Sequence, residues 1–228
     1  MLRRGFTLAE VLITIGIIGV VAALSTPAIM QNTQNAKIGP QLAKLSTTVE
    51  TGIQAIMTDQ EKQYFKDVVS RDETQTDVSV PIQMDSIVGN YIKAREYTKT
   101  LPEFKNMSDS AKFSANGFNT TIESTYIFSD KSAIAVPDCT LGDDGNGNIT
   151  NYCVFYAIMP GFANKTGLVM GKDVFPFFVS IEGHILTPTE ANLSDANDEC
   201  TEDNVLDRKT TGAFCVDKIA ENGWKVHY

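Results

Sequence analysis

The longest apolar stretch of the chain lies at its N-terminus. Residues 6–29 are apolar almost throughout, and the one ionisable residue among them is Glu10. As a helix rising about 1.5 Å per residue, this stretch would be about 36 Å long. That length exceeds the hydrocarbon core of a bilayer, which is about 30 Å thick. The pattern therefore predicts a transmembrane helix over residues 6–29.

A second periodic stretch follows directly. Within residues 30–58, apolar side chains recur every three or four positions, at Ile38, Leu42, Leu45, Val49, Ile53 and Ile56. This spacing places them on one face of an amphipathic helix. We therefore expect the helix to continue and to pack that face on the downstream domain. Pro27 and the pair Gly39-Pro40 are expected to kink or interrupt it, because proline removes a helical hydrogen bond.

Residues 59–228 are patterned as short strands separated by turns, and they are long enough for one globular domain. Two hairpins and one further strand are predicted, at Thr125–Phe128 with Ala133–Val136, at Val174–Ile181 with His184–Leu186, and at Val154–Met159. Short helices are expected over Asp85–Thr98 and Ser108–Phe118. The sequence thus predicts an α+β fold in which a long N-terminal helix packs on a small antiparallel β-sheet.

Glu10 is the residue of the apolar stretch that most needs an explanation. A charged carboxylate at the centre of a bilayer costs about 2.5–3.5 kcal/mol on insertion scales, so such a residue marks a functional site. Nothing else in residues 6–29 can neutralise it. Arg3 and Arg4 precede the stretch and place the N-terminus in the cytoplasm by the positive-inside rule.

Residues 1–30, with Arg3-Arg4-Gly5-Phe6 ahead of Glu10 and the apolar run, resemble the N-terminus of type IV pilins and of type II secretion pseudopilins. The resemblance implies that residues 1–5 are a leader peptide, cut between Gly5 and Phe6 by a prepilin peptidase. It implies N-methylation of Phe6 and identifies Glu10 as the assembly glutamate. Pro27 falls where many relatives carry a helix-loosening proline.

The resemblance also implies the partners and the location. The expected partners are the prepilin peptidase and N-methyltransferase, other pilin or pseudopilin subunits, an inner-membrane assembly platform and membrane lipid. The expected product is a single-pass protein of the bacterial inner membrane, with its C-terminal domain outside the cytoplasm, that assembles into a filament. It would be a structural subunit and not an enzyme.

Elementary chemistry supports these roles. Glycine lets a protease approach the backbone closely at Gly5. Cleavage would leave a new amine on Phe6, whose ordinary pKa near 7.7–8.0 keeps it largely cationic. The Glu10 carboxylate of one subunit could then pair with the Phe6 amine of its neighbour, so that subunits add only in register.

Other interpretations of the N-terminus remain open. Arg3-Arg4 is also compatible with a twin-arginine export signal, and Val21-Ala22-Ala23 with a signal peptidase site. A plain membrane anchor is the third alternative, in which case the domain would be a tethered or exported enzyme or binding protein. Within the pilin class, the sequence does not separate type II secretion, type IV pili and DNA uptake.

The charge of the chain excludes some partners. The formal net charge is −9, and removal of Arg3 and Arg4 with the leader makes the side-chain charge −11. This acidity argues against nucleic acid binding, which requires a basic face. It equally disfavours binding to an anionic membrane surface.

Four cysteines in a domain expected to be exported indicate disulfide bonds. Four cysteines allow three connectivities, of which the simplest joins Cys139 to Cys153 and Cys200 to Cys215. A zinc site is not expected, because there is no Cys-x-x-Cys pair. The only histidines are His184 and His227, and neither lies beside a nucleophile motif.

No cofactor is expected, with calcium as the one weak candidate. The stretch from Asp143 to Ile149 resembles an EF-hand loop but lacks its first acid and its closing glutamate. A second candidate is the acidic run Asp195, Asp198, Glu199, Glu202, Asp203 and Asp207. Charge runs of this kind usually face water, so a solvated loop is the simpler interpretation.

Overall fold

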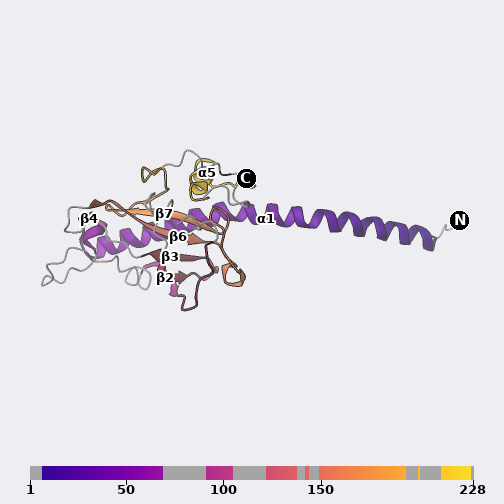
Figure 1. Cartoon of the computed structure of the whole chain (residues 1–228), viewed down its shortest axis with the longest axis horizontal. Helices are drawn as coiled ribbons and strands as arrows, with labels where there is room; N and C mark the ends of the chain where they lie inside the picture. Colours follow the sequence, from indigo (N-terminus) through magenta and orange to yellow (C-terminus); the bar gives the residue numbers. More distant parts are fainter. Residues whose placement is uncertain are drawn as a thin grey trace, which may run out of the picture.

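The computed structural model of the chain describes residues 7–68, 91–104, 122–137, 142–143, 149–193, 200 and 212–226. Its outline is a long helix that projects from one end of a compact domain (Figure 1). The α+β fold class predicted from the sequence is confirmed, as is the packing of a long N-terminal helix on an antiparallel sheet.

Helix α1 runs from Leu8 to Asp59 as one helix of 52 residues. Its N-terminal half leaves the domain, and its C-terminal half lies along the sheet (Figure 1). The helix passes through Gly39-Pro40 without a break, so the predicted interruption there is wrong. A single proline removes only one helical hydrogen bond. Leu42 and Leu45, buried in the turns that follow, bind the helix to the domain on the C-terminal side of that defect.

Six strands form one antiparallel sheet in the order β1-β2-β3-β6-β7-β8. Their bounds are β1 Arg95–Glu96, β2 Ile122–Ile127, β3 Ala133–Pro137, β6 Tyr152–Ile158, β7 Val174–Ser180 and β8 Ile185–Leu186. A separate two-stranded ribbon joins β4, Gly142–Asp143, to β5, Ile149–Thr150. Three short helices complete the described elements: η1 Phe65–Asp67, η4 Phe162–Asn164 and α5 Cys215–Glu221.

The alternation of side chains along the central strands divides the core into two layers. On β6, Phe155 and Ala157 face the layer that also contains the apolar stripe of α1. Val154 and Tyr156 face the opposite layer. Strand β7 pairs with the whole length of β6, from Tyr152↔Ser180 to Ile158↔Val174, and alternates in the same way. Both strands are therefore buried on two faces, which explains their nearly continuous apolar sequence.

The layer between α1 and the sheet is the principal core. The predicted helical stripe is buried there, with Leu42, Val49 and Ile53 at 0% exposure. Phe155 and Phe177 stack beneath it with ring centroids 5.6 Å apart. The opposite layer is covered by connecting segments, through the side chains of Phe104, Phe162, Leu168, Met170, Ala213 and Phe214.

Both predicted hairpins are present, as β2 with β3 and as β7 with β8, and the predicted central strand is β6. In the described part of the helix predicted over Asp85–Thr98, only Tyr91 and Ile92 are helical, and the prediction is wrong from Lys93 on, since Arg95 and Glu96 pair with β2. Lys93 has a positive φ of 52°, which ends any helix there, and long-range pairing then outweighs local propensity. The helix predicted over Ser108–Phe118 lies outside the described residues.

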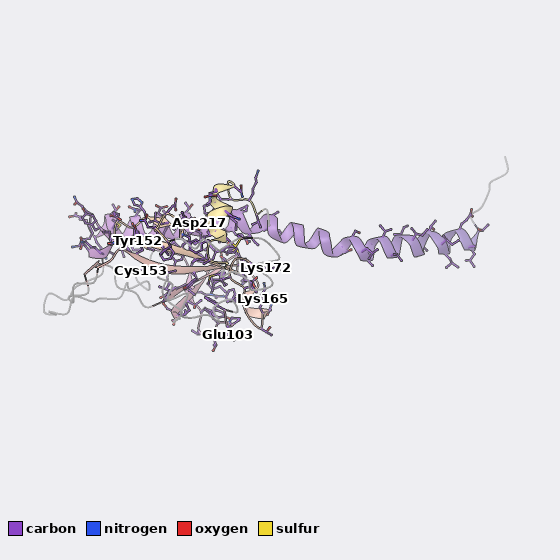
Figure 2. All side chains as sticks on the ribbon, turned by 45° about the horizontal axis from the view of Figure 1, so that its top comes forward. Glu103, Tyr152, Cys153, Lys165, Lys172 and Asp217 are labelled. Carbon is purple, nitrogen blue, oxygen red and sulfur yellow. A yellow bond between two sulfur atoms is a disulfide. The ribbon has the colours of Figure 1, made fainter. Side chains whose placement is uncertain are left out.

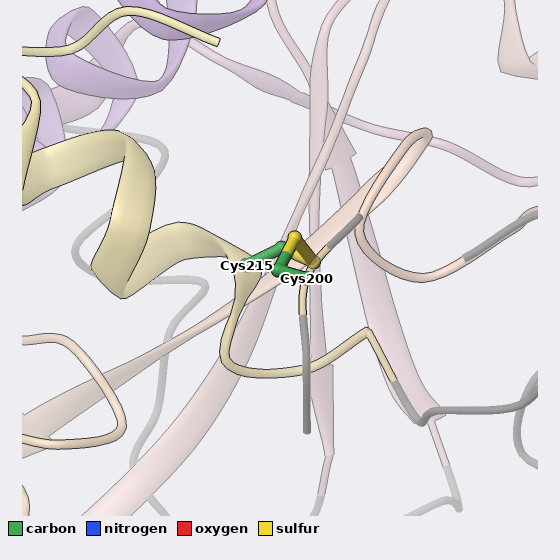
Figure 3. The surroundings of a disulfide bond; sticks show 2 residues. All are labelled: Cys200 and Cys215. Carbon is green, nitrogen blue, oxygen red and sulfur yellow. A yellow bond between two sulfur atoms is a disulfide. The ribbon is translucent and has the colours of Figure 1, made fainter. Parts of the chain in front are cut away.

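A disulfide bond joins Cys200 to Cys215 at the start of α5, with Cα atoms 5.2 Å apart (Figure 3). This is the simplest pairing expected from the sequence. Cys153 is also disulfide-bonded. Cys139, the partner expected for Cys153 from the sequence, lies outside the described residues. Close packing surrounds the described bond, because a Cβ added at Gly171 would lie 3.0 Å from the Cys215 sulfur.

Candidate functional site

The free half of α1 is the most unusual surface of the molecule. Leu8–Thr26 has a mean hydropathy of 2.3 and is long and apolar enough to cross a membrane. None of it is buried against the domain. Ten large apolar side chains are exposed along it, from Leu8 at 79% to Leu24 at 76%. In the rest of the described chain, Tyr64 is the one large apolar side chain with comparable exposure.

The energetics of this surface require a partner. Burying one large aliphatic side chain yields about 1.5–3 kcal/mol, so ten of them represent about 15–30 kcal/mol. Soluble monomers rarely expose a contiguous apolar surface of this size. The segment from Leu8 to Thr26 contains 19 residues, or about 28 Å of helix, which matches a hydrocarbon core of about 30 Å. A lipid bilayer and the apolar faces of other helices could each bury this surface.

Glu10 lies at the N-terminal end of this surface, where a capping box holds it. One carboxylate oxygen accepts hydrogen bonds from the backbone N–H and the hydroxyl of Thr7, both at 2.9 Å. The Thr7 hydroxyl in turn accepts the Glu10 backbone N–H at 3.3 Å. The geometry satisfies two of the unpaired donors at the helix end and places the carboxylate near the positive end of the helix dipole.

This arrangement orients the charge without neutralising it. Thr7 supplies neutral donors, and within the described part of the chain no cation contacts Glu10. A carboxylate held in this way at the end of an apolar helix can accept a cation from another molecule. Thr7 is a helix-capping partner of Glu10 that the charge pattern alone does not reveal. The signal that identifies it is the Thr-x-x-Glu spacing of Thr7 to Glu10, which is the sequence signature of a capping box.

Several residues singled out from the sequence fall outside the description. Gly5 and Phe6 precede the described residues. Pro27 lies within the continuous helix α1, whose side chains are not described at that point. Its predicted kink therefore stays a prediction.

The calcium candidates Asp195, Asp198, Glu199, Glu202, Asp203 and Asp207 all lie outside the described residues. In the stretch that resembles an EF-hand, Asp143 and Ile149 pair across the β4–β5 ribbon. The residues between them are not described. Over the ranges that the structure does describe, no three His, Cys, Asp or Glu side chains are grouped to hold a metal ion.

The domain also contains titratable groups away from α1. The ring of His184 lies 3.3 Å from the Glu50 carboxylate, and both side chains are exposed. Asp217 on α5 is buried, and that burial raises the pKa of its carboxyl group. One of its oxygens accepts the Thr189 backbone N–H at 3.0 Å, whereas the other is buried and has no hydrogen-bond partner among the described residues. His227 lies outside the described residues.

Comparison with protein families gives a match at this same N-terminal segment. The model for the prokaryotic N-terminal methylation motif matches residues 1–26. Comparisons with curated proteins and with solved structures gave no match. The matched segment contains Glu10 with its capping residue Thr7, and it ends with the free apolar half of α1 at Thr26. The motif supports a type IV pilin-like prepilin that is a structural subunit anchored by a single helix. Over residues 1–26, the chain therefore carries the prepilin-type motif of type IV pilins and pseudopilins.

Proposed function

We propose that this chain is a prepilin that is cleaved between Gly5 and Phe6, N-methylated on Phe6 and assembled into a pseudopilus or a type IV pilus. The observation that carries the proposal is the free apolar half of α1, which presents one oriented carboxylate at its N-terminal end. The motif at residues 1–26 supports the same processing. The partners are the prepilin peptidase, other subunits of the filament and the membrane assembly platform.

Assembly follows from the geometry at the helix end. Cleavage removes Arg3 and Arg4 and creates a cationic amine on Phe6, next to the cap residue Thr7. Glu10 then pairs with the Phe6 amine of a neighbouring subunit inside the bundle of apolar helices. Two opposite charges about 4 Å apart attract by about 4 kcal/mol at an effective dielectric constant near 20. A subunit out of register would leave that charge unpaired, so the pair selects the register.

The described domain fits a location outside the cytoplasm. The Cys200–Cys215 bond forms and persists in an oxidising compartment. With Arg3 and Arg4 on the cytoplasmic side, a single span places the domain on the opposite side of the inner membrane. The type II pseudopilus and the type IV pilus would both use this helix and this carboxylate, so neither feature distinguishes the two filament classes. The genomic neighbourhood and the abundance of the subunit in sheared filaments would distinguish them.

The test of the assembly step uses Glu10→Ala and Glu10→Gln in the native host. We expect both variants to be cleaved and methylated normally, because the residues at the scissile bond are unchanged. Both should be incorporated into filaments at least tenfold less than the wild type, since neither supplies a charge for the Phe6 amine. The measurement is the amount of subunit in sheared filaments relative to the membrane pool. Incorporation of Glu10→Gln at the wild-type level would refute the charge pair.

A further inference from the structure

The short helix α5 contacts α1 where the long helix leaves the domain. Both views of the whole molecule show α5 at this place, and Asp217 marks it in Figure 2. The Cys200–Cys215 bond fastens its first residue, and Val216 and Ile219 are buried in the main core. Helix α5 is therefore a fixed support for the residues that follow it.

The end of α5 directs the following residues towards α1. The Gly223 N–H donates to the Ala220 carbonyl at 3.0 Å and the Trp224 N–H donates to the Ile219 carbonyl at 2.8 Å, which is a Schellman motif. Gly223 and Trp224 have positive φ angles of 66° and 61°. This conformation is ordinary for glycine, but a bulky residue adopts it only where the surrounding structure holds it. The backbone at Trp224 is therefore strained.

Two contacts hold Trp224 in place. Its ring stacks on Phe177 of β7 with the centroids 6.5 Å apart. Its carbonyl oxygen lies against α1, because a Cβ added at Gly39 would be 1.8 Å from that oxygen. The Gly39 Cα itself is thus close enough for a Cα–H···O contact with the oxygen, which a larger residue would prevent. We call residues 223–226, which make this contact, the clasp.

The clasp meets α1 at its least helical residues. Inside a helix, glycine is about fivefold and proline about 150-fold less favourable than alanine, and Gly39 and Pro40 are adjacent. Helix α1 nevertheless continues through them from Leu8 to Asp59. Of residues 36–38, Ile38 is the one that packs against the core, and it does so beside the clasp. The clasp is therefore well placed to hold the helix together on the N-terminal side of Pro40.

We propose that the clasp keeps α1 straight through Gly39-Pro40, and that its release turns this point into a hinge between the free half of α1 and the domain. While the Trp224 carbonyl lies against Gly39, the helix cannot bend towards the clasp. The clasp is suited to release, because Trp224 and Val226 are only partly buried and the strain at Trp224 opposes the contact. An open hinge lets the domain turn relative to the free half. The inference concerns α1 and α5 and does not depend on cleavage at Gly5.

The first test is hydrogen exchange of the full-length chain in detergent, read by mass spectrometry on peptides that cover residues 35–44. Trp224→Ala removes the ring stack, and we expect exchange over residues 35–44 to become at least tenfold faster, beyond any increase in β6 and β7. Trp224→Phe keeps an aromatic ring on Phe177 and is the matched control, with exchange close to the wild type. Pro40→Ala added to Trp224→Ala should restore slow exchange, because it repairs the helix itself.

Two results of this test would overturn the proposal. Exchange over residues 35–44 that is unchanged in Trp224→Ala would show that the clasp does not hold the helix. Exchange that rises equally in β6 and β7, and that Pro40→Ala does not slow, would show that Trp224 only stabilises the domain as a whole.

The second test measures the hinge directly, by the distance between two spin labels on α1. Val20→Cys and Thr51→Cys place exposed labels on either side of Gly39, about 46 Å apart along a straight helix. The described cysteines are all disulfide-bonded, so the labels attach to the new thiols. The otherwise unchanged chain should give one narrow distribution of distances, and Trp224→Ala should give a broader one that extends to shorter distances. An equally narrow distribution in both would contradict the hinge.

Discussion

The contact between Gly39 and the C-terminal segment gives the sharpest structural prediction. Gly39 is buried in α1, and a Cβ at this position would lie 1.8 Å from the carbonyl oxygen and 2.5 Å from the carbonyl carbon of Trp224. Real Cβ atoms do not approach backbone atoms so closely, and neither partner is the end of a flexible side chain. Gly39→Ala should therefore push the C-terminal segment off the helix.

The size of the effect follows from what that segment covers. The Trp224 ring stacks on Phe177 at 6.5 Å, an arrangement worth about 1 kcal/mol beyond its burial. Trp224 and Val226 are both partly buried on the main core, and their combined burial contributes about 3 kcal/mol. Against this loss, alanine is a better helix former than glycine by about 1 kcal/mol. The variant should be less stable by about 3 kcal/mol.

The assay is thermal unfolding of the detergent-solubilised full-length chain, followed by circular dichroism and by Trp224 emission. A loss of about 3 kcal/mol lowers the melting temperature by about 6–12 °C for a domain of this size. The emission of Trp224 should shift to the red, because the ring becomes more exposed. Gly16→Ala is the matched control, since nothing lies within 4 Å of a Cβ at that position. Unchanged stability and unchanged emission of Gly39→Ala would refute the reasoning.

Three further predictions concern the cap, the disulfide and the buried acid. Thr7→Ala should weaken the N-terminal turn of α1 by about 1 kcal/mol, measured by hydrogen exchange, and should reduce the recovery of the subunit in sheared filaments. Thr7→Ser keeps the hydroxyl and should have neither effect. Cys200→Ser combined with Cys215→Ser should lower the free energy of unfolding by about 3 kcal/mol, measured with denaturant, because a loop of sequence separation 15 is no longer closed. Burial raises the pKa of Asp217 in the folded state, so its contribution to stability is complete below the pKa of the unfolded chain and is lost as the pH rises through the folded pKa. In thermal melts recorded between pH 3 and pH 8, Asp217→Asn should therefore not show the fall in stability with rising pH that the wild type shows. A variant with the wild-type pH profile would show that the Asp217 carboxyl group does not cause this fall.

Patterns with a short period were the most predictable part of the fold. The helical stripe from Leu42 to Ile56 has a local period, and the central strands are short apolar runs bounded by turn residues, so the sequence predicted α1, β6 and β7. The point at which the helix expected over Asp85–Thr98 gives way to a strand was not predictable from a local pattern. Arg95 and Glu96 pair with residues about thirty positions away, and no local propensity records that contact.

The candidate site likewise has parts that local sequence patterns predict and parts that they do not. Glu10 was evident because a single carboxylate in an apolar run is costly and therefore conspicuous. Its capping partner Thr7 is readable from a local motif. The contact of Gly39 with Trp224 joins residues from opposite ends of the chain, and only the folded structure reveals why a glycine is required there.

The central claim is that the chain is processed as a prepilin. The measurement that tests it most directly is the mass of the N-terminal peptide of the protein isolated from the membranes of its native host. The account predicts a chain that begins at Phe6 and carries one methyl group on its amine. A peptide that still begins at Met1 would indicate a plain anchor, and cleavage near Ala23 would indicate an ordinary export signal. Either result would contradict the account.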